Sequence, residues 1–516
     1  MAHFKTISPK YEVQTSEKLG RYAVAAKDLR SGEKILTDEP FILGPNSDGS
    51  LICFNCYLPL ISKFVVCKNC AVAPICPGDG CPEHMLKKWH SAAECDFFRT
   101  LKLTKGLHPI TMVQNVGSLL VLRAILKKKS NPEQWDEFLQ LEAHMDKRIG
   151  TSIWEFYENT VQFIESLGLF EGSIDSNLVQ KICGIIDVNS FEVRGPLVPG
   201  IGVAEVLRGV YLKAALLAHD CTANTHMSIN DNNLLVCHAS IDIKQGEPIY
   251  YNYTDPLKGT SIRQQHLRIG KYFQCSCNRC SDVTELGTYI SSVLCPACKT
   301  GYMTNISEEW TCHSCEKKFE TSGLSRKVQM CIDKFGVINK KDERELEEFI
   351  RNVSLILAPN HFVLLDAKQR LAGVLRDTIN REPRPTKKLM KRKMELCREI
   401  LPVLDKLCPG ISRTKAITLY ELHVAMVQLA KKLYDGRELT GPAYLDELLA
   451  SEKYLKRSLE MLFLEPGNSP EGELCAKALE EYKALKATIS SVLDGIHSDG
   501  RVYITEVTEA EEISVN

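Results

Sequence analysis

The sequence predicts an α+β protein made of several domains, and three observations support this prediction. The chain has 516 residues, too many for one hydrophobic core and typical of two to four domains. Strand-like and helical stretches are segregated along the chain rather than alternating. Most of its 21 cysteines gather in clusters whose spacing is typical of metal-binding modules.

The composition is that of an ordinary globular protein, with 44% apolar and 25% charged residues. The 64 Lys and Arg residues nearly balance 65 Asp and Glu residues, so the net charge does not indicate a protein that coats nucleic acid. We expect no membrane span, because no run of 18 apolar residues occurs. We expect no signal peptide either, because "MAHFKTISPK" lacks an apolar core. An intracellular, soluble protein is therefore expected, in which zinc is the usual partner of many cysteines.

The first cysteine cluster offers eight candidate ligands, enough for two tetrahedral zinc sites. The short reach of each pair suggests two interleaved sites, one formed by Cys53, Cys56, Cys76 and Cys81 and the other by Cys67, Cys70, His90 and Cys95. The alternatives are a set of buried free cysteines, and His84 in place of His90. A structural zinc site contributes about 10–16 kcal/mol in finger peptides, against about 5–15 kcal/mol for a whole domain. We therefore expect that this module does not fold without metal.

The second and third clusters predict two further zinc sites. The stretch "CSCNRC" leaves a tetrahedral site one ligand short, and Cys221 of "LAHDCTANT" is the candidate fourth ligand beside Cys275, Cys277 and Cys280. The pairs "CPAC" and "CHSC", 13 residues apart, predict a zinc ribbon formed by Cys295, Cys298, Cys312 and Cys315. The remaining cysteines are expected in the core: Cys183, Cys237, Cys331, Cys397, Cys408 and Cys475.

Patterns between the clusters predict the secondary structure. Residues 4–43 and 186–256 have the β-rich, turn-broken character of short strands, whereas residues 110–185 and those after 323 show helical spacing. The apolar stripes of the last region are expected to pack on one another and suggest stacked helix pairs. They are Leu346, Phe349, Ile350, Val353 and Leu357; Leu419, Leu422, Met426, Leu429 and Leu433; and Leu445, Leu448, Leu449, Leu455, Leu459 and Leu462.

Several stretches, taken together, resemble one family. "LGRYAVAAKDLRSGEKILTDEP" resembles the opening of a SET methyltransferase domain, and the eight-ligand cluster resembles a MYND finger inserted into it. "DVNSFEV", "LAHDCTANT", "GEPIYYNYTD" and "KYFQCSCNRC" resemble the remaining motifs in the right order. Nearly the whole chain, including "PNHF" and "EPGNSPEG", resembles a SET and MYND domain-containing protein. The ribbon, "AHDC" and "DVNSFEV" are most similar to the arthropod-type branch.

The resemblance implies a split, β-rich SET core with an inserted MYND zinc finger, a post-SET zinc site, a zinc ribbon and a C-terminal TPR-like helical domain. We found no clean 34-residue repeat in that last domain. The implied boundaries are 1–52 for the first part of the SET domain, 53–95 for the MYND finger, 96–185 for a helical insert, 186–256 for the SET core, 257–285 for the post-SET site, 290–320 for the ribbon, 324–496 for the helical domain and 497–516 for a flexible acidic tail.

The resemblance also implies S-adenosylmethionine as methyl donor and a protein lysine, in a histone or another protein, as acceptor. In water, deprotonating a lysine at pH 7 costs roughly 4–5 kcal/mol, and an apolar channel next to a sulfonium lowers that cost. Tyr253 matches the catalytic tyrosine, and Cys221 matches a ligand of the post-SET zinc, which disfavours a nucleophilic Cys–His pair. The cofactor-binding residues implied by the motifs are Gly20, Arg21, Asn189, Ala218, His219, Tyr253 and Phe273.

Three departures from the family motifs favour an alternative function. Ala218, Asp220 and Ala223 replace the motif's Asn, Ser and Pro, Tyr22 replaces a glycine, and Lys271 stands where an aromatic residue often precedes the post-SET cysteines. The alternative is a catalytically weak or inactive adaptor or transcriptional regulator, whose MYND finger binds a proline-containing peptide and whose helical domain binds a partner.

The location and the other partners are expectations as well. We expect a monomer in the nucleus and cytoplasm. The basic run Lys387–Lys393 is expected to be a solvated helix face, with direct nucleic-acid binding as the open alternative.

Overall fold

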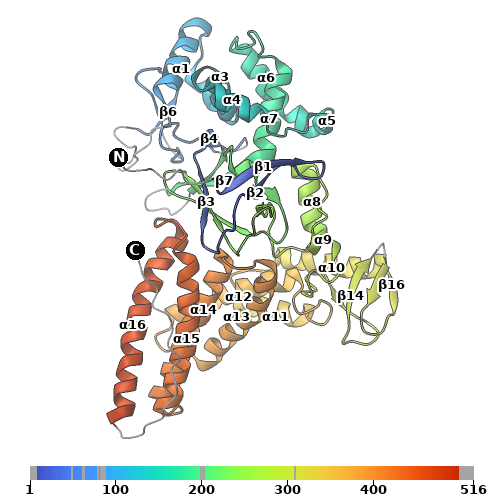
Figure 1. The fold of residues 1–516 in the computed structure, drawn as a ribbon, viewed down its shortest axis with the longest axis vertical. Coiled ribbons are helices and arrows are strands. Elements are labelled where there is room, and N and C mark those ends of the chain that lie inside the picture. Colours follow the sequence, from blue (N-terminus) through green and yellow to red (C-terminus); the bar gives the residue numbers. More distant parts are fainter. Residues whose placement is uncertain are drawn as a thin grey trace. The chain divides into compact units, whose positions relative to one another are not determined.

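The computed structural model describes residues 9–47, 50–60, 64–77, 81, 89–197, 204–306 and 309–498. It divides the chain into two compact units (Figure 1): the first is Met1–Ser291 with the returning segment Lys406–Ser412, and the second is Ser292–Asp405 with Arg413–Asn516. The predicted strands at residues 4–8, the rival ligand His84 and residues 499–516 of the predicted tail lie outside the described residues. Within the described residues, no helix is long and apolar enough to span a membrane.

The first unit contains small, mostly antiparallel sheets that join distant parts of the chain. A hairpin is formed by β1 (Tyr11–Ser16) and β2 (Gly20–Ala25), and a three-stranded sheet has the order β10 (Thr225–Ile229), β11 (Leu235–Ala239) and β3 (Lys34–Asp38). A second three-stranded sheet has the order β4 (Ile42–Pro45), β8 (Ala204–Val210) and β7 (Ser190–Leu197), and β9 (Ala218–His219) pairs in parallel with β12 (Tyr250–Tyr251). Two strands before residue 46, β3 and β4, therefore pair with strands after residue 189.

The chain between those paired strands forms the cysteine-rich module and a group of helices. The module contains the two-stranded ladder β5 (Val65–Val66) and β6 (Pro74–Ile75). The helices are α1 (Ala92–Lys105), α2 (Pro109–Gln114), η1 (Val116–Ser118), α3 (Leu119–Ser130), α4 (Pro132–Leu139), α5 (Met145–Arg148), α6 (Ser152–Ser166) and α7 (Ser176–Asn189). The predicted helical region is confirmed, but it begins earlier, at α1, and α7 continues beyond residue 185.

Local sequence explains where these helices begin and end. The Ser91 side chain accepts from the backbone N–H of Glu94 at the start of α1, and Gly106 ends that helix in the left-handed conformation at φ 65°. The Asp175 side chain caps α7 in the same way. Their apolar faces bury a common core that includes Phe98, Leu119, Phe138, Ile164 and Ile182, which explains why these helices form in this chain.

The remaining elements of the first unit lie before β9 and after β12. η2 (Ala214–Leu216) leads into β9, and α8 (Thr260–Lys271) and α9 (Asn278–Ser281) carry the second cysteine cluster between and within them. Leu267 of α8 is fully buried beside Cys221 and Cys275. This packing places the end of α8 close to the strand pair β9–β12.

The second unit begins with a four-stranded antiparallel sheet, followed by helices. The sheet has the order β13 (Val293–Leu294), β14 (Tyr302–Ile306), β15 (Glu309–Cys312) and β16 (Lys318–Glu320). Its helices are α10 (Thr321–Val337), α11 (Glu343–Val353), α12 (Phe362–Arg381), α13 (Lys387–Leu407, whose last residues belong to the first unit), α14 (Arg413–Asp435), α15 (Gly441–Leu462) and α16 (Pro470–Ser498). α14 packs on α15, and α15 packs on α16 (Figure 1).

Most residues of the predicted apolar stripes are buried in this unit. One stripe residue and one residue of the basic run differ from the sequence expectation. Leu346, Phe349 and Ile350 of α11 lie in the core as predicted, but Leu449 of α15 remains 38% exposed. In the basic run, Lys393 is 1% exposed and forms an ion pair with Glu421. That run is therefore not a fully solvated face. Of the six cysteines expected in the core, all but the partly buried Cys408 are buried.

Gly410 gives a test of the returning segment. Its φ is 68°, and a Cβ atom at this position would lie 1.7 Å from the carbonyl oxygen of Ser240. Ile411 donates its N–H to the same oxygen at 2.9 Å. We expect Gly410→Ala to lower the free energy of unfolding by about 2–3 kcal/mol, because the segment must shift or strain its backbone.

The matched control is Gly270→Ala in α8, where no atom lies within 4 Å of the added Cβ. That variant should be neutral or stabilised by up to about 1 kcal/mol. Denaturant unfolding of both variants and the parent protein makes the comparison. Equal stability of the two variants would contradict the close approach at Gly410.

Candidate functional site

Four groups of thiols and one imidazole form the candidate metal centres. In each group the potential ligand atoms lie within 4.8 Å of one another. Four soft sulfur or nitrogen donors match the closed tetrahedral environment of structural zinc. The groups are Cys53, Cys56, Cys76 and Cys81; Cys67, Cys70, His90 and Cys95; Cys221, Cys275, Cys277 and Cys280; and Cys295, Cys298, Cys312 and Cys315. The structure thus brings together the residues of each ligand set predicted from the sequence.

A buried carboxylate orients the histidine of the second group. Nδ1 of His90 lies 2.9 Å from Oε1 of Glu94, and Nε2 lies 3.6 Å from Sγ of Cys70. Glu94 in turn accepts from Nε of Arg123 at 2.7 Å, and Arg123 also donates to the hydroxyl of Tyr57 at 2.6 Å. This carboxylate directs Nε2 toward the thiols, which is the arrangement that metal-binding histidines usually have.

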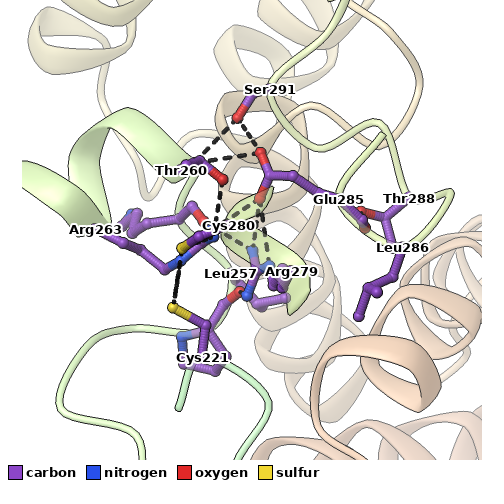
Figure 2. A network of polar contacts seen from close by, with 12 residues as sticks. Cys221, Leu257, Thr260, Arg263, Arg279, Cys280, Glu285, Leu286, Thr288 and Ser291 are labelled. Atoms are coloured by element: carbon purple, nitrogen blue, oxygen red, sulfur yellow. Dashed lines mark hydrogen bonds and ion pairs between the residues drawn. The ribbon is translucent and has the colours of Figure 1, made fainter. Parts of the chain in front are cut away.

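A buried ion network supports the third group (Figure 2). Arg263 donates through Nε to Sγ of Cys221 at 3.3 Å and through Nη2 to Sγ of Cys280 at 3.6 Å. Arg263 and Arg279 both form ion pairs with Glu285, at 2.9 and 3.1 Å. Both arginine side chains are 0% exposed. Four thiolates around a divalent zinc ion carry a net charge of two minus, so the buried guanidinium groups offset charge that burial would otherwise disfavour.

A cavity of about 290 Å³ is lined by Tyr253, which packs against Cys221 and Cys275 of the third group. Its walls come from the junction of α7 with β7, from the end of α8, and from β12 with the residues that follow it. The lining residues are Val188, Asn189, Ser190, Phe191, Glu192, Ala215, Tyr251, Asn252, Tyr253, Thr254 and Lys271. The cavity therefore combines aromatic walls with a few polar groups, which is typical of a binding site.

Three of the predicted site residues meet at this cavity or next to it. Tyr253 donates its hydroxyl to the carbonyl oxygen of Leu217 at 2.6 Å and its N–H to Nδ1 of His219 at 3.0 Å. The His219 ring lies 5.1 Å from the Tyr253 ring and 5.9 Å from the Phe273 ring, measured between centroids. Burial raises the pKa of Tyr253 above its usual value. The phenol is therefore protonated at neutral pH and is held as a donor.

The other predicted cofactor residues are divided between the cavity wall and positions away from it. Asn189 lines the cavity, and its side-chain amide donates at 2.8 Å to the carbonyl oxygens of Glu142 and Ile185. Ala218 is 9% exposed and pairs with Tyr250 in the parallel β9–β12 ladder. Gly20 and Arg21 start β2 and do not line the cavity. The Arg21 guanidinium donates to the side chain and the backbone of Gln140, both at 2.9 Å.

Several residues of the site were missed by sequence reasoning. Lys271 was noted only as a departure from a motif, and nothing in the sequence indicated that it lines the cavity. Arg263 gave no signal, because its contacts with Cys221 and Glu285 join residues that are 42 and 22 positions apart. Glu94 did offer one, since it is an acidic residue only four positions after the candidate ligand His90, with which it pairs.

Comparisons with known proteins agree with these observations, although no family model matches the chain. The SET domain-containing protein SmydA-8, isoform A, of Drosophila melanogaster is 26% identical over 424 residues, which are 80% of this chain and 88% of that protein. The histone-lysine N-methyltransferase SMYD3 of Mus musculus is 27% identical over 288 residues, 52% of this chain and 61% of that enzyme. A SET and MYND domain-containing protein of Dictyostelium discoideum is 22% identical over 311 residues, 51% of this chain and 58% of that protein.

These relatives define a class of SET domain proteins that includes lysine methyltransferases. The similarity to these proteins supports the assignment of the chain to the SET and MYND domain-containing family. Its resemblance to the arthropod-type branch is in line with the similarity to the Drosophila protein over most of both chains.

The four ligand groups lead to a test by metal analysis. We expect four zinc ions per chain in purified protein, because each group supplies a complete tetrahedral donor set. Cys221→Ser should contain three ions, whereas Cys331→Ser, which changes a buried cysteine outside the groups, should keep four. Two or fewer ions in folded wild-type protein would refute the assignment.

The guanidinium of Arg263 leads to a second test. We expect Arg263→Met to lower the free energy of unfolding by about 3–5 kcal/mol, since the change leaves buried charge on Glu285 and the thiolates less well compensated. The control is Arg99→Met, which breaks the exposed pair with Asp96 and should cost less than about 1 kcal/mol. Similar losses in both variants would show that the buried network contributes little.

Proposed function

We propose that this protein is an S-adenosylmethionine-dependent protein-lysine N-methyltransferase that acts on histone or non-histone proteins. The observation that carries the proposal is that Tyr253 lines the 290 Å³ cavity, bonds to His219, whose ring lies next to Phe273, and packs against Cys221. The similarity to a histone-lysine N-methyltransferase supports the reaction class. The proposal assigns β1–β4 and β7–β12 to a split SET core, and α10–α16 to a TPR-like domain.

The residues predicted to bind the cofactor offer an aromatic face and polar groups that suit S-adenosylmethionine. Phe273 keeps 36% exposure next to His219, which leaves a ring face for stacking with an adenine. Asn189, Ala218 and His219, with Gly20 and Arg21 on β2, are the further residues that would hold the cofactor. When bound, S-adenosylmethionine supplies an electrophilic methyl group on a positively charged sulfur.

The residues of the cavity would prepare the acceptor amine. Aromatic walls from Phe191, Tyr251 and Tyr253 exclude water and therefore favour the neutral amine over the ammonium. The Tyr253 hydroxyl donates a hydrogen bond to the carbonyl oxygen of Leu217, and its own oxygen retains acceptor capacity for an amine N–H. The tyrosine would thus orient the amine, which is the main task left once the amine is neutral.

Two observations favour the adaptor as a second candidate function. Ala218 has no side-chain hydrogen-bonding group, and the Arg21 guanidinium is already bonded to Gln140. Both weaken the polar contacts available to a cofactor. In that case the MYND finger would bind a proline-containing peptide and the helical domain another protein. For either function we propose a monomer found in the nucleus and cytoplasm.

Tyr253→Phe tests the proposed function. Affinity for S-adenosylmethionine, measured by calorimetry, should stay within about twofold, whereas methyl transfer to core histones should fall about tenfold to hundredfold, because the variant loses one hydrogen bond at the reacting centre. Tyr434→Phe, which alters a tyrosine that is 42% exposed on α14, is the control and should retain full activity. No cofactor binding by the wild-type protein at millimolar concentration would favour the adaptor.

A further inference from the structure

Lys271 brings an amine of the protein itself into the cavity. It is the last residue of α8 and one of the lining residues. Its ammonium donates to the carbonyl oxygen of Val188 and lies 5.4 Å from the centroid of the Tyr253 ring. The carbonyl belongs to α7 and not to the end of its own helix, so this contact is more than the usual preference of lysine for a helix C-terminus.

The charged groups around Lys271 do not form an ion pair with it that would fix its charge. Asp187 of α7 is bonded to Arg148 and Arg208, each at 2.9 Å. Glu192 of β7 and Tyr251 lie in the cavity wall, and burial raises the pKa of Tyr253, which is therefore a neutral phenol at neutral pH. Burial, with the Arg208 charge adding to it and Asp187 opposing it, lowers the pKa of Lys271 to about 8. The side chain is thus cationic below pH 8 and becomes neutral above it.

We propose that Lys271 accepts the proton of the acceptor lysine in this cavity. The proposal deepens the proposed function and rests on it. The acceptor enters as an ammonium while Lys271 is neutral, and one N–H proton passes to the lone pair of Lys271 Nζ. The acceptor nitrogen then forms a bond to the methyl carbon, and the carbon–sulfur bond breaks with its electron pair remaining on sulfur. The product is a methylammonium, which keeps the two remaining N–H protons and carries the positive charge that the sulfonium has lost.

The observed contacts explain why Lys271 can receive that proton. Val188 O accepts a hydrogen bond from the ammonium, and the face of Tyr253 stabilises a cation. These contacts stabilise the protonated form, whereas burial and Arg208 oppose it. Their balance keeps the pKa near neutrality, which is where a proton acceptor is most effective. A lysine that only anchors α8 would gain from a carboxylate partner, but Asp187 bonds to two arginines instead.

The first experiment measures Lys271 without any turnover. The full chain is labelled with 13Cε-lysine, and the Lys271 signal is assigned by its loss in Lys271→Met. We expect its titration midpoint at about pH 8. Adding S-adenosylmethionine should lower that midpoint, because a second cation enters the cavity, whereas neutral S-adenosylhomocysteine should leave it nearly unchanged. A midpoint above pH 10, or no difference between the two ligands, would overturn the proposal.

The second experiment separates proton transfer from a structural role. Lys271→Arg keeps a cation that can donate to Val188 O but cannot lose its proton, and Lys271→Met keeps only the apolar stem. With core histones, both variants should lose about tenfold to hundredfold in kcat/KM at pH 8. We expect the activity of the wild type to rise through pH 8, and both variants should lack this rise. Lys213→Met, at an exposed lysine of the same unit, is the control. Recovery of activity by arginine would make Lys271 a structural residue.

Calorimetry with S-adenosylmethionine distinguishes failure of this inference from failure of the proposed function. If the wild type and both variants bind the cofactor equally, the activity and titration results decide the role of Lys271. If the wild type does not bind it, the methyltransferase function fails, and the role of Lys271 fails with it. If the wild type binds it but leaves core histones unmodified, the ligand-dependent titration decides alone.

Discussion

The meeting of the Cys221 thiol with the three thiols of the second cysteine cluster is the interaction on which the rest of the candidate site depends. Cys221 follows the short strand β9, whereas Cys275, Cys277 and Cys280 lie beyond the end of α8. A metal ion held by all four would tie these segments together, and structural zinc supplies about 10–16 kcal/mol in small peptides. His219 and Phe273 are each two residues from a cysteine of this group, so such a centre would fix the two rings next to each other.

Burying such a centre places charged groups in a medium of low dielectric constant, and two of the centres have similar buried ion pairs next to them. Arg263 contacts the sulfurs of Cys221 and Cys280 and is held by Glu285. In the finger, the Glu94 carboxylate contacts His90 and is held by Arg123. In both places a buried guanidinium–carboxylate pair lies directly behind metal ligands. Because each member satisfies the other, neither charge is left alone in a medium of low dielectric constant.

In the cavity, by contrast, the cation of Lys271 has no carboxylate partner among the described residues, and this changes its protonation behaviour. Here Lys271 faces a carbonyl and an aromatic ring rather than a carboxylate. An ion-paired lysine would stay charged over the whole physiological range, whereas this environment leaves its two protonation states close in free energy. The paired charges therefore give rigid support to the metal centres, and the unpaired amine gives the cavity a group that changes charge near pH 8.

The sequence alone determined those features that depend on neighbours close along the chain. Ligand spacing was enough to group thiols that lie close along the chain, since zinc needs four soft donors and short pairs such as Cys53 and Cys56 must share an ion. The distant Cys221 was only a candidate from the sequence, supported by the family resemblance. Helical periodicity was enough to identify Leu346, Phe349 and Ile350 as core residues. The tertiary structure decided that Leu449 stays exposed, that Lys393 is buried against Glu421, and that Lys271 lines the cavity. The physical reason is that each of these outcomes depends on a partner from another element, and no local pattern records which element that will be.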